Sequence, residues 1–201
     1  MTNLGETYHA LGRLAEAEDT LTEALALQRA AGSRNVEPDT LRSLAAVLRD
    51  AGRYVDALAC VQDGLTLARD IGDRRIEAEA LAVQASVRLR LGDEDAAADE
   101  YRQALDLARK IGNRYTEADT LIGLAEVHLR AGRLDQASEH ADAALAIAAD
   151  VGYQVVADRA KVLRLAARGI DASVCRRPDD LSHNDRTGQA NLNPQVKGFA
   201  I

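Results

Sequence analysis

This chain has few side chains of the types that take part in catalysis or metal binding, and their spacing in the sequence does not group them into a site. The candidates are four histidines and two cysteines: His9, His128, His140, His183, Cys60 and Cys175. No two histidines have the helical spacing of a metal-binding pair with a carboxylate between them. The cysteines form neither a metal-spaced cluster nor a disulfide framework, and the single glycines form no phosphate-binding loop. We therefore expect no catalytic residue, no metal site and no cofactor.

Composition and charge argue against two classes of partner. The chain has 201 residues and a formal net charge of −7, and its arginines are scattered among aspartates and glutamates. A chain of this kind repels phosphate backbones at long range, so direct binding of nucleic acid is not expected. No apolar run approaches the roughly 20 residues that span a bilayer, and the N-terminus does not resemble a signal peptide. We expect a cytoplasmic protein with no membrane partner.

The strongest feature of the sequence is a repeat with a period of 40 residues. Four columns of identical residues recur at this interval and remain in phase along the chain. They are Gly12, Gly52, Gly92 and Gly132; Gly32, Gly72, Gly112 and Gly152; Ala17, Ala57, Ala97 and Ala137; and Leu25, Leu65, Leu105 and Leu145. Such agreement is far beyond chance, so the fold must be built from one repeated unit.

The two glycines of each period divide it into two helices, because glycine tolerates the left-handed conformation that closes a helix. The alanine near the start of the second helix allows a close approach to the first helix, and the leucine continues a buried stripe. Pro38 falls in a first helical turn, where its missing N–H is not needed. This pattern predicts helices at about 1–11, 14–31, 37–51, 54–71, 74–91, 94–111, 114–131, 134–151 and 153–169.

The expected domain organisation is one array, 1–170, followed by a polar C-terminal tail, 171–201. The repeats cover about 1–32, 33–72, 73–112 and 113–152, and a charged helix at 153–169 caps the last apolar face. The first repeat has no cap before Leu4, which suggests a fragment of a longer protein or a neighbouring chain at that end. Homo-oligomers through this end or through the tail are therefore expected as an alternative. The segment Leu192 to Ile201 is hypothesised to lie extended on an array, unless it is an extension without a biological role.

The columns resemble the tetratricopeptide repeat (TPR) family. In the first repeat, the positions that carry the resemblance are Leu4, Gly5, Tyr8, Gly12, Ala17, Leu21 and Ala24. The 40-residue variant resembles the arrays of spindle-orientation adaptors, kinesin light chains and bacterial, actinomycete-type transcription regulators. This resemblance implies an all-α fold, a right-handed α-solenoid of helix-turn-helix repeats with a concave surface lined by the first helix of each repeat.

The resemblance also implies which side chains face that concave surface. They are Thr2, Glu6, His9, Asp39, Arg42, Arg49, Glu79, Ser86, Arg90, Asp119, Ile122, Glu126 and Arg130. Any one of them is equally consistent with an ordinary solvated residue. Together they mix both charges, which suits a peptide that also carries both signs and whose register is set by charge. The Lys/Asn clamp of chaperone-binding relatives is missing, because its positions hold Thr2, Glu6, Ser43, Glu79 and Val83.

The sequence therefore predicts a non-catalytic scaffold that binds a peptide or protein segment in a concave groove, within a larger regulatory protein. One alternative is the sensing domain of a transcription regulator, which would bind a small molecule or peptide. Another alternative is a non-catalytic subunit of an enzyme complex. An enzyme would need a cluster of buried ionisable groups, and a peptide-sized dry pocket within the superhelix would favour the sensor over a scaffold for a protein partner.

Overall fold

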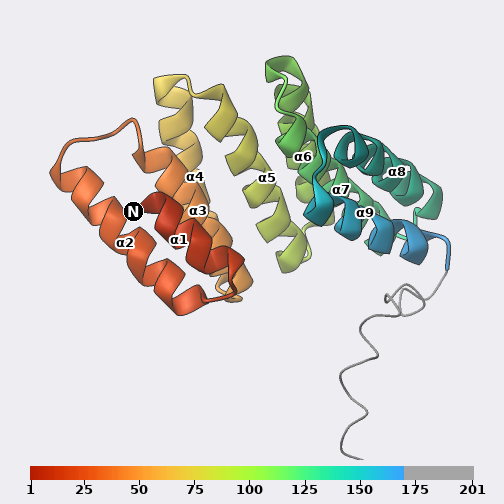
Figure 1. Ribbon diagram of the computed structural model, residues 1–201, viewed down its shortest axis with the longest axis horizontal. Coiled ribbons are helices and arrows are strands. Elements are labelled where there is room, and N and C mark those ends of the chain that lie inside the picture. The colour runs from red at the N-terminus through yellow and green to blue at the C-terminus, as the bar shows by residue number, and fades with distance from the viewer. Residues whose placement is uncertain (170–201) are drawn as a thin grey trace, which may run out of the picture. The chain divides into compact units, whose positions relative to one another are not determined.

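The computed structural model describes residues 1–169 of the chain, and this part is built from helices and short turns without a strand (Figure 1). The helices are α1 (Thr2–Ala10), α2 (Leu14–Ala30), α3 (Glu37–Asp50), α4 (Tyr54–Ile71), α5 (Arg74–Leu91), α6 (Glu94–Ile111), α7 (Arg114–Arg130), α8 (Leu134–Val151) and α9 (Gln154–Ala167). The predicted all-α solenoid is confirmed, and the helices lie where the period places them. The predicted tail, 171–201, and the hypothesis on Leu192 to Ile201 lie outside the described residues.

The turns follow from the glycine columns. Gly72 has a φ of 74° and closes α4, and the N–H of Asp73 then donates to the carbonyl of Ala68 at 2.9 Å. Asp73 in turn caps α5, because its Oδ1 accepts from the backbone N–H of Ile76 at 3.0 Å. One glycine and one capping residue thus end a helix and begin the next.

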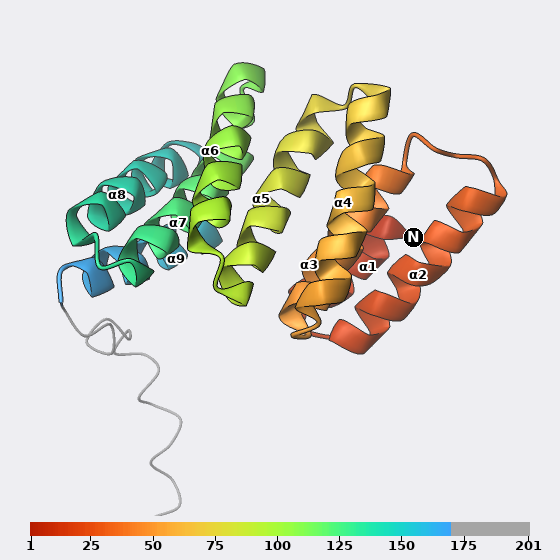
Figure 2. The same cartoon turned by 180° about the vertical axis from the view of Figure 1, so that it is seen from behind.

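The core is thin and consists largely of small side chains. All four members of the alanine column, from Ala17 to Ala137, are 0 % exposed. Each helix packs against the next one along the chain, and α1, α3, α5, α7 and α9 also contact one another in sequence, as the two opposite views indicate (Figures 1 and 2). The first helices of successive repeats are therefore neighbours, and α9 takes the corresponding place after α7.

A column of ion pairs, which the sequence pattern did not reveal, links one repeat to the next. Glu77 accepts from Arg69 Nε at 2.9 Å and from Arg74 Nη1 at 2.7 Å. One period later, Glu117 accepts from Arg109 at 3.0 Å and from Arg114 at 2.9 Å. These glutamates are at most 8 % exposed, as is Glu37 one period earlier. The arginines at positions 69 and 109 lie on second helices and the glutamates on the following first helices, so each cluster ties two repeats together.

Ionisation of Glu77 is governed by two opposing effects. Burial opposes the charge, but the hydrogen bonds from Arg69 and Arg74 outweigh it and hold the pKa of this carboxyl below its ordinary value of 4.5. A carboxyl whose pKa is lowered by folding stabilises the folded state above its ordinary pKa. That contribution is lost as the pH falls through the folded value.

We predict that Glu77→Gln lowers the free energy of unfolding by about 1–2 kcal/mol at pH 7, because two charge-assisted hydrogen bonds are lost. The difference from the unmodified chain should shrink at pH 3, which lies below the ordinary pKa of this carboxyl, because the unfolded chain is protonated there and the contribution of the lowered pKa falls. Urea denaturation at both pH values checks this, with the exposed Glu23→Gln as the control. A difference of the same size at both pH values would contradict the assignment.

Candidate functional site

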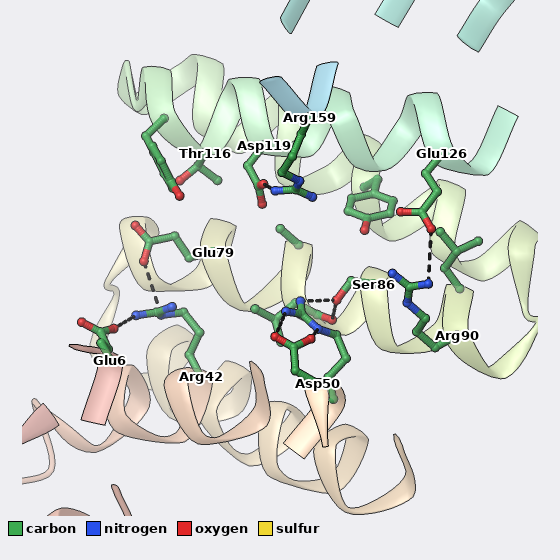
Figure 3. Close-up of a pocket in the computed structure, with 16 residues that line it drawn as sticks. Glu6, Arg42, Asp50, Glu79, Ser86, Arg90, Thr116, Asp119, Glu126 and Arg159 are labelled. Atoms are coloured by element: carbon green, nitrogen blue, oxygen red, sulfur yellow. Dashed lines mark hydrogen bonds and ion pairs between the residues drawn. The ribbon is translucent and has the colours of Figure 1, made fainter. Parts of the chain in front are cut away.

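The first helices surround a cavity of about 600 Å³ (Figure 3). We call it the central cavity. Its lining residues are Glu6, Arg42, Arg49, Asp50, Glu79, Ala82, Val83, Ser86, Leu89, Arg90, Tyr101, Tyr115, Thr116, Asp119, Glu126 and Arg159. They come from α1, α3, α5, α6, α7 and α9, so every first helix contributes to one space.

Most of the residues predicted to face the concave surface meet at this cavity. Those that line it are Glu6, Arg42, Arg49, Glu79, Ser86, Arg90, Asp119 and Glu126. His9 and Arg130 do not line it but bond to its walls, whereas Thr2 and Asp39 line a second hollow next to the turn before α3. Ile122 is only 1 % exposed and lies at the base of a third, mostly apolar hollow. That these residues bind a partner stays a prediction.

One half of the cavity is acidic. Arg42 Nη2 donates to Glu6 Oε1 at 2.6 Å and to Asp39 Oδ1 at 2.8 Å, and its Nε lies 3.4 Å from Glu79 Oε2. Burial opposes the charge of Arg42, but these carboxylates outweigh it, and the pKa of the guanidinium is raised above 12.5. Arg75 also pairs with Glu79 at 3.1 Å. Three carboxylates thus share two guanidinium groups.

The opposite half contains a network centred on Asp50. Arg49 donates to both oxygens of Asp50, at 2.7 and 3.0 Å, and His9 Nε2 lies 2.7 Å from Asp50 Oδ2. Burial disfavours the charge of this carboxylate, but His9 and Arg49 outweigh that effect and hold its pKa well below the ordinary value. The sequence prediction missed Asp50, which lies next to Arg49 in the chain and is captured by it.

This network brings together a serine, a histidine and an aspartate, but not as a nucleophilic triad. Ser86 Oγ accepts from Arg49 Nη1 at 3.0 Å and donates to the carbonyl of Val83 at 2.7 Å. His9 contacts the aspartate rather than the hydroxyl, so no base is placed to deprotonate Ser86. The arrangement fixes Arg49 in the cavity wall.

The same half is basic at its rim. Glu126 Oε1 accepts from Arg130 Nη2 at 3.0 Å and lies 3.5 Å from Arg90 Nη1. Arg130 also donates to the carbonyl of Leu89 at 3.0 Å. With Arg49 and Asp50 included, this half has three guanidinium groups and two carboxylates.

A separate ion pair crosses the middle of the cavity wall. Arg159 Nη1 of α9 donates to Asp119 Oδ1 of α7 at 2.5 Å. Arg159 was expected only to give the capping helix a charged face. It reaches the cavity because α9 occupies the position that a fifth first helix would have.

Tyr101 enters the cavity wall from α6, a second helix. It replaces Leu21, Val61 and Ala141 of the corresponding positions, and it is 5 % exposed. A Cβ atom on Gly123 of α7 would lie 2.2 Å from Tyr101 Cζ. The ring therefore occupies space that is available only because position 123 is glycine, and burial raises the pKa of its hydroxyl.

Histidines and cysteines elsewhere have packing roles in the described residues. His128 is 9 % exposed and accepts from Arg133 Nε at 2.8 Å, and its ring lies 5.0 Å from that of His140. Burial raises the pKa of the Cys60 thiol to about 11. Within residues 1–169 no group of three potential ligands is placed to hold a metal ion. None of the helices described has the length and apolar character needed to cross a membrane.

Comparison with known proteins agrees with this geometry. The sequence profile of the MalT-like TPR region matches residues 1–173, so the predicted TPR resemblance is confirmed. No curated protein matches the chain. The solved structures that are similar to it include the following three. A STAND protein with a tetratricopeptide repeat sensor from Pyrococcus horikoshii has a TM-score of 0.66 and 19 % identity, over 83 % of this chain and 26 % of that one.

The second is aspartyl phosphate phosphatase F from Bacillus subtilis, with a TM-score of 0.69 and 15 % identity, over 83 % of this chain and 46 % of that one. The third is a putative kinesin light chain array of TPR-like repeats from Podosopora anserina. It has a TM-score of 0.61 and 17 % identity, over 84 % of both chains. These likenesses concern the fold. The chain spans about a quarter of the first protein and just under half of the second.

We predict that Gly123→Ala destabilises the chain by about 1–3 kcal/mol, because the new methyl group displaces the Tyr101 ring. In a Tyr101→Val background, which copies the residue at position 61, the same substitution should cost well under about 1 kcal/mol. Urea denaturation of the two single variants and the double variant measures this coupling. Additive effects would show that Tyr101 and Gly123 do not share the space.

Proposed function

We propose that this chain, which belongs to the MalT-like TPR family, is a recognition module that binds a peptide or protein segment in its central cavity. The observation that carries the proposal is that charged side chains from α1, α3, α5, α7 and α9 all meet at the central cavity. A surface with no role in recognition has no need for four arginines within one cavity, each held by at least one carboxylate.

The geometry of these arginines supports recognition over a purely structural role. Among residues 1–169, the carboxylate nearest to Arg90 is that of Glu126 at 3.5 Å, and Arg159 is half exposed. Both guanidinium groups therefore retain donors that an incoming carboxylate would accept. Pairing within the wall also fixes the arginines in position before a ligand arrives, which reduces the entropy lost on binding.

A second candidate function is signal sensing within a larger regulatory protein. The family profile is that of a MalT-like region, and one structural relative is described as a STAND protein whose TPR array is a sensor. The size of the central cavity supports this role, since a volume of about 600 Å³ is within the usual range for small ligands. In this version, the bound peptide is the signal and the rest of the regulatory protein responds to it.

We predict that peptides selected from a random displayed library against the full chain lose at least about tenfold in affinity to an Arg90→Glu, Arg159→Glu variant. The matched control is Arg102→Glu, since Arg102 is exposed on α6 and pairs only with its neighbour Asp99. Fluorescence anisotropy gives the affinities, and circular dichroism confirms that each variant is folded. Equal binding to all three proteins, or the absence of any selected ligand, would contradict the proposal.

A further inference from the structure

The central cavity is electrically polarised along its helices. At one end Glu6 and Glu79 pair with Arg42, and Asp39 and Arg75, which do not line the cavity, bond to this group. At the other end Arg90 and Arg130 share the single carboxylate of Glu126, and Arg130 bonds to the wall without lining the cavity. Figure 3 shows Glu6, Arg42 and Glu79 at one end and Arg90 and Glu126 at the other, with Asp50 and the Asp119–Arg159 pair between the two ends. The cavity therefore has an excess negative charge at one end and an excess positive charge at the other.

The distance between the two ends is set by α5. Glu79 and Arg90 are eleven positions apart on this helix, which corresponds to about 16 Å along the helix axis. An extended peptide covers that distance in about five residues. A ligand that satisfies both ends therefore needs opposite charges about five positions apart.

An apolar hollow adjoins the basic end. Arg90, Glu126 and Arg159 line both this hollow and the central cavity. Its apolar walls are Ile122 of α7 together with Val162 and Leu163 of α9, and we call these three residues the apolar shelf. Val162 is half exposed, so the shelf offers an aliphatic surface to whatever lies against Arg90 and Arg159.

From these three features we infer that the central cavity binds an extended peptide segment with a basic and an acidic residue about five positions apart, and with an aliphatic residue next to the acidic one on the side away from the basic one. The basic side chain lies near Glu6 and Glu79, the acidic side chain lies between Arg90 and Arg159, and the aliphatic side chain packs on the apolar shelf. The inference rests on the proposed function and adds to it the chemistry and orientation of the ligand. Charge placement sets the register, and the apolar contact adds affinity.

The test uses the full chain and a fluorescent peptide blocked at both termini, with lysine, four alanine or glutamine spacers, glutamate and leucine. Comparison peptides exchange the lysine and glutamate, replace the leucine with serine, or place lysine at both charged positions. Anisotropy should give an affinity for the first peptide at least about tenfold above that for the peptide with two lysines, which cannot pair at the basic end in either direction. The affinity should also be several-fold above those for the serine and charge-exchanged peptides, because an exchanged peptide that reverses its direction to pair its charges loses the contact with the apolar shelf.

Two variants assign these preferences to residues. Arg90→Glu should lower the affinity for the first peptide about tenfold and raise the affinity for the peptide with two lysines, because the charge at position 90 is reversed. Val162→Ser should abolish the preference for leucine over serine, whereas Val55→Ser, at an exposed position of α4, should leave it unchanged.

The inference is overturned if the first and the charge-exchanged peptides bind equally. It is also overturned if Arg90→Glu leaves their ranking unchanged, or if none of the designed peptides binds. In each case, the proposed function would remain intact if the binding of library-selected peptides still depends on Arg90 and Arg159. Failure of the selected peptides to show that dependence would reject the proposed function as well.

Discussion

The approach of neighbouring helices across alanine side chains is the constraint on which the rest of the structure depends. Ala17, Ala57, Ala97 and Ala137 have no exposed surface, and each stands where a larger side chain would separate the two helices of a repeat. Because a single helix pair buries little apolar surface, stability comes from stacking one repeat on the next. Stacking in turn makes neighbours of α1, α3, α5, α7 and α9, and only that arrangement brings their polar faces to one cavity.

Helices α5 and α7 serve both the scaffold and the cavity with side chains only two positions apart. On α5, Glu77 faces the preceding repeat and is held by Arg69, whereas Glu79 faces the cavity and Arg42. The scaffold positions are nearly identical from one repeat to the next. The cavity positions differ: the position of Glu6 holds Ala46, Ser86 and Glu126 in later repeats. One repeated frame thus presents different side chains at the same cavity position of different repeats, and this makes a polarised surface possible in a periodic fold.

The sequence was sufficient to predict the helices, because glycine stops and the alanine column act locally or between adjacent helices. The cavity was predictable only where a residue held a family position on a first helix, as Arg42, Glu79 and Arg90 do. Arg159 was missed because α9 has lost half of the repeat pattern.

Two further contacts depend on packing that no periodic signal records. The reach of Tyr101 into the cavity depends on the missing side chain of Gly123, on another helix. Ile122 was predicted to face a groove and is instead 1 % exposed at the base of the apolar hollow, where it shares the walls with Val162 and Leu163 of α9. The ion pair between Arg69 and Glu77 was likewise not predicted from the sequence, although both positions recur with the 40-residue period.

The central claim is that the shared face of the first helices, rather than the second helices, is the binding surface. A crystal structure of the full chain with a library-selected peptide tests this most directly. The account predicts peptide density within the central cavity, between α3, α5 and α7, with side chains against Arg90 and Arg159. Peptide density on α2, α4, α6 or α8, with the cavity left to solvent, would contradict it.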